Sequence, residues 1–220
     1  MSFAVLIMAV KSNTAVALKY PEGMRATDAE KFQAIASATN QMTRLTEDLL
    51  FLARTDKLPI QTKESTEITL ILQNLFQLYQ PQAEAKNIIL NNQVTEKIYV
   101  FGDAVQLTRL FTNLIQNAIN YTLPEGVVNI TASRIGSHVI VKVQDTGVGI
   151  APQDLAKIFE RFWRADRSRA YRGGSGLGLA IAQAIAQNHD GLITVTSQLG
   201  VGSCFTVRLN AYSTVKSVKR

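Results

Sequence analysis

The sequence has little cysteine, few histidines and only a mild excess of positive charge, and these shortages limit the kind of protein that it can be. A single cysteine, Cys204, rules out an internal disulfide and is typical of a reducing compartment. Charged residues make up 18% of the chain and the net charge is +6, with five arginines between Arg161 and Arg172. Because these basic residues are clustered in one short segment, they favour a phosphate-bearing ligand at a single place over an extended groove for nucleic acid. We therefore expect no nucleic-acid partner.

Long apolar runs are also missing. Residues 3–10 are apolar, but eight residues cannot span a bilayer, and neither a basic start nor a cleavage site marks a signal peptide. We therefore expect a cytoplasmic protein whose membrane attachment, if any, comes from parts of a parent protein not present here. The hydrophobic content of 46% is ordinary for a globular chain of one large or two modest domains.

The first 59 residues predict two helices. A helix over residues 2–18 ends before the breaker at 20–23, and a second begins at Thr27, with Glu30 completing a capping box. The second helix has apolar residues at alternating spacings of three and four: Ile35, Ala38, Met42, Leu45, Leu49 and Leu52. This pattern favours a helical hairpin that pairs with a second chain, and the alternative is an ordinary helix packed on its own domain.

Composition changes near residue 59, and helices and strands then alternate. We expect helices over 65–80 (capped by 65–67, interrupted at Pro81 and resuming to 86), 104–121, 152–159 and 177–188, and strands over 88–90, 98–100, 127–133, 139–143, 193–195 and 204–207. The boundaries predicted are a helical domain over 1–59, an α/β domain over 60–212 and a basic tail over 213–220.

Two of the polar motifs indicate a nucleotide. Asn113 and Asn117 are four residues apart on one helix face, where their amide oxygens suit magnesium shared with phosphate; the alternative is a solvent-exposed polar face. Asp145 ends a strand and is followed by Gly147 and Gly149. This carboxylate can accept a hydrogen bond from an exocyclic amine while the glycines allow a planar ring to approach, although many such runs are simple turns.

Two further motifs indicate phosphate binding. Residues 174–179 place glycines at the start of a helix, where free amides attract an anion, and they match neither a P-loop nor a dinucleotide fingerprint. Residues 159–166 interleave aromatic residues with Arg161 and Arg164, which is typical of a lid that reaches a terminal phosphate or, equally, of an interface patch.

In this order and spacing, the four blocks resemble the ATP-binding domain of sensor histidine kinases. They correspond to its N box (113–122), first glycine box (145–150), F box (159–162) and second glycine box (174–179). The resemblance covers residues 60–210, and residues 49–54 resemble the second helix of the family's dimerisation and phosphotransfer domain. It implies an α+β chain: a dimerising helical hairpin followed by an α/β sandwich of the Bergerat type.

The resemblance also implies ligands and roles. Asp145 would bind the adenine amine, Tyr121 would flank the base, and Asn117 with Asn113 would hold Mg²⁺ on the phosphates of ATP. The residues implied to contact ATP are Asn113, Asn117, Asn120, Tyr121, Asp145, Gly147, Gly149, Arg161, Arg164, Gly174, Ser175, Gly176, Leu177 and Gly178. The reaction implied is γ-phosphoryl transfer to a histidine, followed by relay to an aspartate in the receiver domain of a response regulator, with the kinase acting as a homodimer.

Two departures from the family pattern matter. Asn120 stands where the family often has a lysine or arginine, a loss that weakens phosphate binding unless Arg161, Arg164 or Arg167 compensates. The family's acceptor histidine would fall near residue 1, yet no histidine precedes His138, so no catalytic residue is assigned. Truncation, replacement and natural loss remain open. The alternative functions are a dimeric ATP-binding scaffold without autokinase activity and another ATPase or serine kinase that shares this nucleotide fold.

Overall fold

The computed structural model describes residues 3–20, 24–55, 64–164 and 175–212. The chain divides into two compact units, Met1–Ala53 and Arg54–Arg220, which we describe separately. Within the described ranges, no helix combines the length and apolar character needed to cross a membrane.

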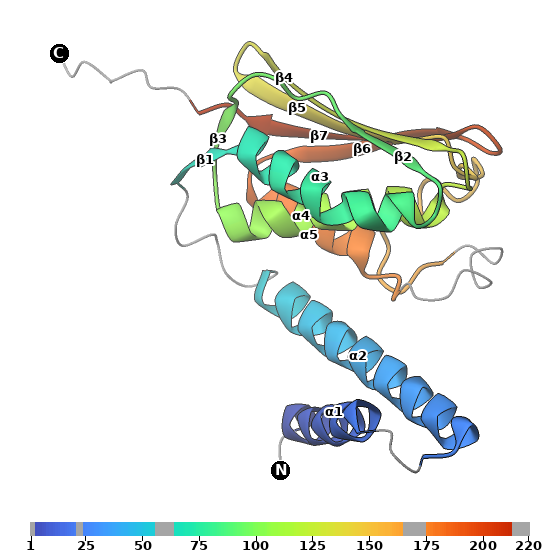
Figure 1. Ribbon diagram of the computed structural model, residues 1–220. Helices are drawn as coiled ribbons and strands as arrows, with labels where there is room; N and C mark the ends of the chain where they lie inside the picture. Colours follow the sequence, from blue (N-terminus) through green and yellow to red (C-terminus); the bar gives the residue numbers. More distant parts are fainter. Residues whose placement is uncertain (1–2, 21–23, 56–63, 165–174, 213–220) are drawn as a thin grey trace. The chain divides into compact units, whose positions relative to one another are not determined.

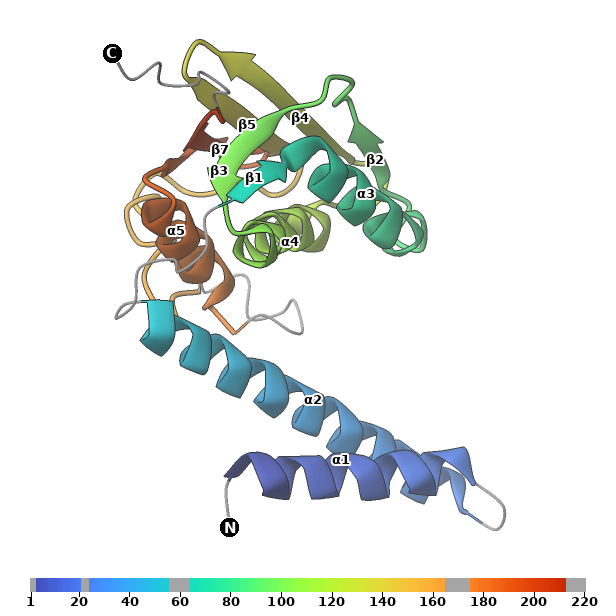
Figure 2. The ribbon, with the colours of Figure 1, turned by 90° about the vertical axis from the view of Figure 1, so that its left-hand side faces the viewer.

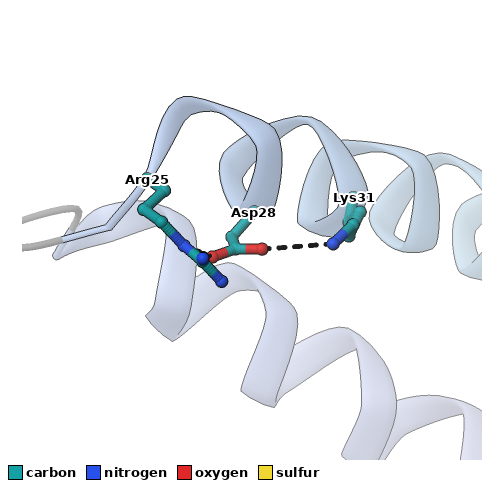
Figure 3. A network of polar contacts seen from close by, with 3 residues as sticks. All are labelled: Arg25, Asp28 and Lys31. Carbon is teal, nitrogen blue, oxygen red and sulfur yellow. Dashed lines mark hydrogen bonds and ion pairs between the residues drawn. The ribbon is translucent and has the colours of Figure 1, made fainter.

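The first unit is a pair of helices, α1 (Phe3–Lys19) and α2 (Ala26–Thr55). The predicted cap at Thr27 is wrong, because α2 already includes Thr27 and its first turn forms on Arg25, whose carbonyl accepts from the amides of Asp28 and Ala29. Asp28 instead holds the turn through ion pairs, 2.9 Å to Arg25 Nε and 3.2 Å to Lys31 Nζ (Figure 3). A carboxylate in the first turn of a helix also interacts favourably with the positive end of the helix dipole.

The predicted seam of α2 is largely exposed in a single chain. Ile35, Met42 and Leu49 keep 43%, 52% and 44% of their surface accessible, whereas Leu52 is buried. The packing of one chain therefore leaves a line of apolar side chains along α2 uncovered.

The second unit contains two sheets and three helices. The strands are β1 (Glu64–Glu67), β2 (Ile89–Asn92), β3 (Tyr99–Gly102), β4 (Val127–Ile135), β5 (His138–Asp145), β6 (Leu192–Gln198) and β7 (Gly202–Asn210). The larger sheet has the order β2-β4-β5-β7-β6, in which only the β2–β4 pair is parallel. β1 and β3 form a small antiparallel sheet at one end of it (Figure 2).

The helices α3 (Ile68–Glu84), α4 (Ala104–Tyr121) and α5 (Gly178–Asn188) cover one face of the larger sheet (Figure 1). Alternation along β4, β5 and β7 directs apolar side chains toward these helices, as the period of two predicts. The fully enclosed core includes Leu107, Leu110, Phe111, Leu114, Ile115, Val128, Ile130, Val139, Val141, Val143, Ile181, Ile185 and Val207. The α+β architecture, helices followed by a mixed α/β sandwich, is confirmed.

Local predictions failed where tertiary packing decides the conformation. Residues 65–67 do not cap a helix but belong to β1, because Thr66 is buried and donates its hydroxyl proton to the Gly102 carbonyl, 2.8 Å away. Pro81 does not interrupt α3, since the buried Tyr79 and Ala83 on either side keep that turn helical.

The predicted helix over 152–159 is a series of turns. Several amides in and just after it bond to a carbonyl three residues back: Asp154 to Ala151, Lys157 to Asp154 and Glu160 to Lys157. These bonds close single turns that do not extend into a regular helix.

Candidate functional site

The floor of the candidate site is a row of polar side chains across the sheet. In register, Asp145 of β5 lies opposite Ser203 of β7, which lies opposite Ser197 of β6. Asp145 is buried, and its Oδ1 accepts from the amides of Gly147 at 2.9 Å and Ser203 at 3.3 Å. Burial raises the pKa of this carboxyl above its usual value, and the two amide donors partly oppose the increase.

Among the described residues, no group donates a hydrogen bond to the other carboxylate oxygen, Oδ2 of Asp145. A buried carboxylate that is held at one oxygen and lacks a donor at the other is costly unless a ligand supplies that donor. An exocyclic amine matches this requirement.

The first glycine box is held against protein backbone on both sides. A Cβ on Gly147 would lie 2.3 Å from the Tyr121 carbonyl oxygen, and the Tyr121 carbonyl accepts from the Val148 amide at 3.1 Å. Gly149 has a φ of +66°, and a Cβ there would lie 2.0 Å from the Gln198 carbonyl oxygen. The protein's own packing therefore requires both glycines, and it joins the N box to the first glycine box.

Helix α4 carries the predicted asparagines. Asp103 caps it by accepting from the amides of Val105 at 2.8 Å and Gln106 at 3.0 Å. Asn113 and Asn117 are half-buried on its face, as the spacing predicted. The Nδ2 of Asn113 is buried and has no hydrogen-bond partner in the described part of the chain.

This unsatisfied amide lies at the second glycine box. A Cβ on Gly178 would meet Asn113 Oδ1 at 3.6 Å, an ordinary contact, so the protein itself leaves room beside Gly178. Buried amides normally have partners, and an orphaned one next to an open helix start fits a missing polar ligand. ATP with its phosphates on this helix start would satisfy both features.

The end of α4 gives Asn120 and Tyr121 different surroundings. Asn120 is exposed, and its Oδ1 accepts from Lys86 Nζ at 3.0 Å; the same amine donates to the Ile119 carbonyl at 3.3 Å. Lys86, from the segment after α3, thus places a cation next to Asn120, the position at which the family often has a lysine or arginine. The Lys86 amine also bonds one of the last carbonyls of α4. Tyr121 is half-buried beside the first glycine box.

The F box and the second glycine box are joined. Gly176 has a φ of +73°, its carbonyl accepts from the Phe162 amide at 2.9 Å, and a Cβ there would lie 2.7 Å from the Phe162 carbonyl carbon. Ser175 Oγ accepts from the Leu177 amide at 3.2 Å, at the start of α5.

The arginines near this junction differ in exposure: Arg161 is exposed and Arg164 is half-buried. Gly174 and Arg167 lie outside the described residues.

Sequence reasoning missed Ser197 and Ser203. Ser203 follows Gly200 and Gly202, yet neither serine has a chemical role that its local sequence reveals, and only the strand register places the two in line with Asp145. The alternation of β7 could have identified Ser203 as an inward-facing polar residue next to Gly202.

His189 is a structural residue in this arrangement. It is buried after α5, Nδ1 donates to the Ile185 carbonyl at 2.8 Å, and Nε2 accepts from the Asp103 amide at 3.0 Å. These contacts join the end of α5 to the start of α4 and leave the ring enclosed.

Known proteins are similar to this chain in sequence and in architecture. The sensor histidine kinase RppB of Synechocystis is 41% identical to this chain, and the match covers 79% of this chain and 39% of RppB. The sensor-like histidine kinase SenX3 of Mycobacterium tuberculosis is 34% identical, and that match covers 91% of this chain and 53% of SenX3. The chain thus spans about half or less of the length of these relatives. The structure of full-length ShkA, solved in complex with AMPPNP, is 26% identical to this chain and superposes with a TM-score of 0.78. The match covers 97% of this chain and 46% of the ShkA chain.

A second solved structure, which covers a smaller share of this chain, has the same fold. The mycobacterial sensor histidine kinase MprB is 27% identical over 68% of this chain and 98% of the solved chain, with a TM-score of 0.61. Residues 102–213, which include the N box, both glycine boxes and the F box, match a single ATPase family. The chain belongs to the family of histidine kinase-, DNA gyrase B- and HSP90-like ATPases.

Proposed function

We propose that this chain is the kinase core of a two-component sensor histidine kinase. It binds Mg-ATP and transfers the γ-phosphoryl group to a histidine, from which a response regulator aspartate receives it. The observation that carries ATP binding is the buried Asp145, held through Oδ1 and open to a ligand amine at Oδ2. The similarity to RppB and SenX3 supports the kinase assignment.

Each part of the site has a task in this proposal. Asp145 accepts from the adenine amine, and the Asn113 amide and the α5 start bind phosphate. The oxygens of Asn117 and Asn113 would hold Mg²⁺, which neutralises charge on the phosphates during transfer. Arg161 and Arg164, beside the junction of the F box and second glycine box, approach the terminal phosphate.

Neither histidine of the chain suits the role of acceptor. His138 starts β5 and Asp145 ends it, so about 23 Å of extended strand separates them. His189 is enclosed between α4 and α5. The acceptor in this proposal is therefore a histidine outside the present sequence, presented by a helical domain.

The decisive experiment supplies that acceptor. The chain is mixed with labelled ATP, Mg²⁺ and a separate helical domain that carries an intact acceptor histidine, with the same domain bearing a His→Gln change as the control. The kinase assignment is supported if acid-labile, base-stable label appears on the domain with the intact histidine and not on the His→Gln control. ATP binding without any label would favour the second candidate, a dimeric ATP-binding scaffold, which the lack of a suitable histidine supports.

The exposed seam of α2 supports a homodimer. Its apolar side chains at Ile35, Met42 and Leu49 would be covered by the same seam of a second chain, as in a two-fold helical bundle. The domain limits proposed are 1–59 for this dimerising hairpin and 60–212 for the ATP-binding domain.

A further inference from the structure

Three hydrogen bonds connect the β6–β7 hairpin to the first glycine box. The Ser203 amide donates to Asp145 Oδ1, and the Gly200 amide donates to the Val148 carbonyl at 2.8 Å. The Ile150 amide donates to the Ser197 hydroxyl at 2.8 Å. Ser197, two strands away from Asp145, therefore holds the far end of the loop that Asp145 begins.

The contacts of Ser197 fix the direction of its hydrogen bonds. Its single hydroxyl proton goes to the Gly202 carbonyl, 2.8 Å away, and one lone pair receives the Ile150 amide. Its remaining neighbour is Ser203 Oγ at 2.9 Å. Because a hydroxyl has one proton and two lone pairs, the proton of this last bond must come from Ser203.

The Ser203 hydroxyl is thereby left with lone pairs alone for any ligand. It lies in the same inward-facing row as Asp145 and is 8% exposed. An ionised carboxylate is also only an acceptor. If both acceptors face the 6-position of a purine, they match the two hydrogens of a 6-amino group and oppose a 6-oxo group, whose lone pairs would face theirs.

We propose that Ser197 is a positioning residue that sets purine specificity by taking the proton of Ser203, so that Ser203 accepts from the base and never donates to it. This inference rests on the proposed ATP site. Without Ser197, the Ser203 hydroxyl is released and can donate to a 6-oxo group. Ser197 thus changes which nucleotide is preferred, in addition to supporting the loop.

The test compares ATP with inosine triphosphate, which carries a 6-oxo group in place of the amine. Both are titrated with Mg²⁺ into the intact chain and into Ser197→Ala by calorimetry. We expect Ser197→Ala to weaken ATP binding about fivefold, the worth of one hydrogen bond, and to lower the ATP-to-inosine-triphosphate affinity ratio by a similar factor. An equal loss for both nucleotides would show a purely structural role and overturn the proposal.

Further variants keep the test decisive. Ser197→Thr retains the hydroxyl and should keep the ratio, and Thr196→Ala, exposed on the adjacent residue of β6, should leave it unchanged. Ser203→Ala should lower the ratio, and adding Ser197→Ala to it should lower it no further, because the two act through one hydrogen bond. An unchanged ratio in Ser203→Ala, measured even if Ser197→Ala fails to fold, also overturns the inference.

The two levels of proposal fail in different ways. If the unaltered chain binds no ATP, the proposed function itself is wrong. If it binds ATP and only the ratio fails to respond to these substitutions, the ATP site stands and the role of Ser197 does not.

Discussion

Asp145 combines burial with a charge, and that combination has a cost in the absence of ligand. Its raised pKa means that the ionised form is disfavoured by the folded protein. Asp145→Asn keeps the shape, and its Oδ1 can still accept from Gly147 and Ser203. We predict that Asp145→Asn raises the melting temperature of the ligand-free protein at neutral pH by a few degrees, measured by calorimetric unfolding. A lower melting temperature would contradict the assigned cause of the pKa shift.

The sign of the pH dependence follows from the same shift. A carboxyl whose folded pKa exceeds its unfolded value contributes stability below the unfolded value, 3.8, and loses that contribution as pH rises through the folded pKa. The stability advantage of Asp145→Asn should therefore be complete above the folded pKa and vanish as pH falls toward 3.8. An advantage that persists at the lowest pH would indicate another cause.

Gly149 and Gly136 form a matched pair for backbone effects. Both have positive φ, +66° and +59°, but a Cβ on Gly149 meets the Gln198 carbonyl at 2.0 Å while one on Gly136 meets nothing within 4 Å. We predict that Gly136→Ala costs about 1–2 kcal/mol from strain alone and Gly149→Ala about 2–5 kcal/mol from strain and collision, by urea unfolding. Equal costs would contradict the close contact between this loop and the β6–β7 turn.

At the level of single residues, sequence reasoning reached the motif positions and stopped there. Asp145, Gly147 and Gly149 were identified because a carboxylate and glycines at a strand end have a direct chemical meaning. Ser197 and Ser203 were not, because their importance depends on the register of three strands distant in sequence. The reason for the glycines also changed, since protein backbone as well as a ligand requires them.

At the level of elements, α4 is the support of the site. Its start is fixed by the Asp103 side chain, which caps it, and by the Asp103 amide, which donates to His189. We predict that Asp103→Ala lowers the free energy of unfolding by about 1 kcal/mol, the usual value of such a cap, by urea unfolding. Glu96→Ala, the same loss of charge at an exposed position, should change it by less than about 0.5 kcal/mol. Similar effects of the two substitutions would exclude the cap as the cause.

The elements that the sequence predicted well are those with a strong pattern of their own. Helix α4 and the β4–β5 pair have clear periodicity and follow the predicted limits closely. Strand β1 was mistaken for a cap because its four residues pair only with β3, more than thirty positions later. Pairing of that kind is decided by tertiary structure, which a local pattern does not contain.

At the level of the whole molecule, the seam of α2 determines assembly in our account. Met42→Lys places a charge in the proposed dimer interface twice, once from each chain, at a cost of about 3 kcal/mol or more. We predict that it raises the dimer Kd at least about a hundredfold in analytical ultracentrifugation and leaves ATP binding intact. Gln41→Lys, exposed on the neighbouring position of α2, is the control and should preserve the dimer. A Met42→Lys protein that remains dimeric would exclude this seam.

The central claim is that Asp145 anchors an ATP site in this chain, and calorimetric titration of ATP with Mg²⁺ tests it most directly. The unaltered chain should bind one ATP. Asp145→Asn should bind it about ten- to hundredfold more weakly, because a charged hydrogen bond to the adenine amine is lost while the fold is kept. Equal affinity of the two proteins for ATP, or no binding by the unaltered chain, would contradict the account.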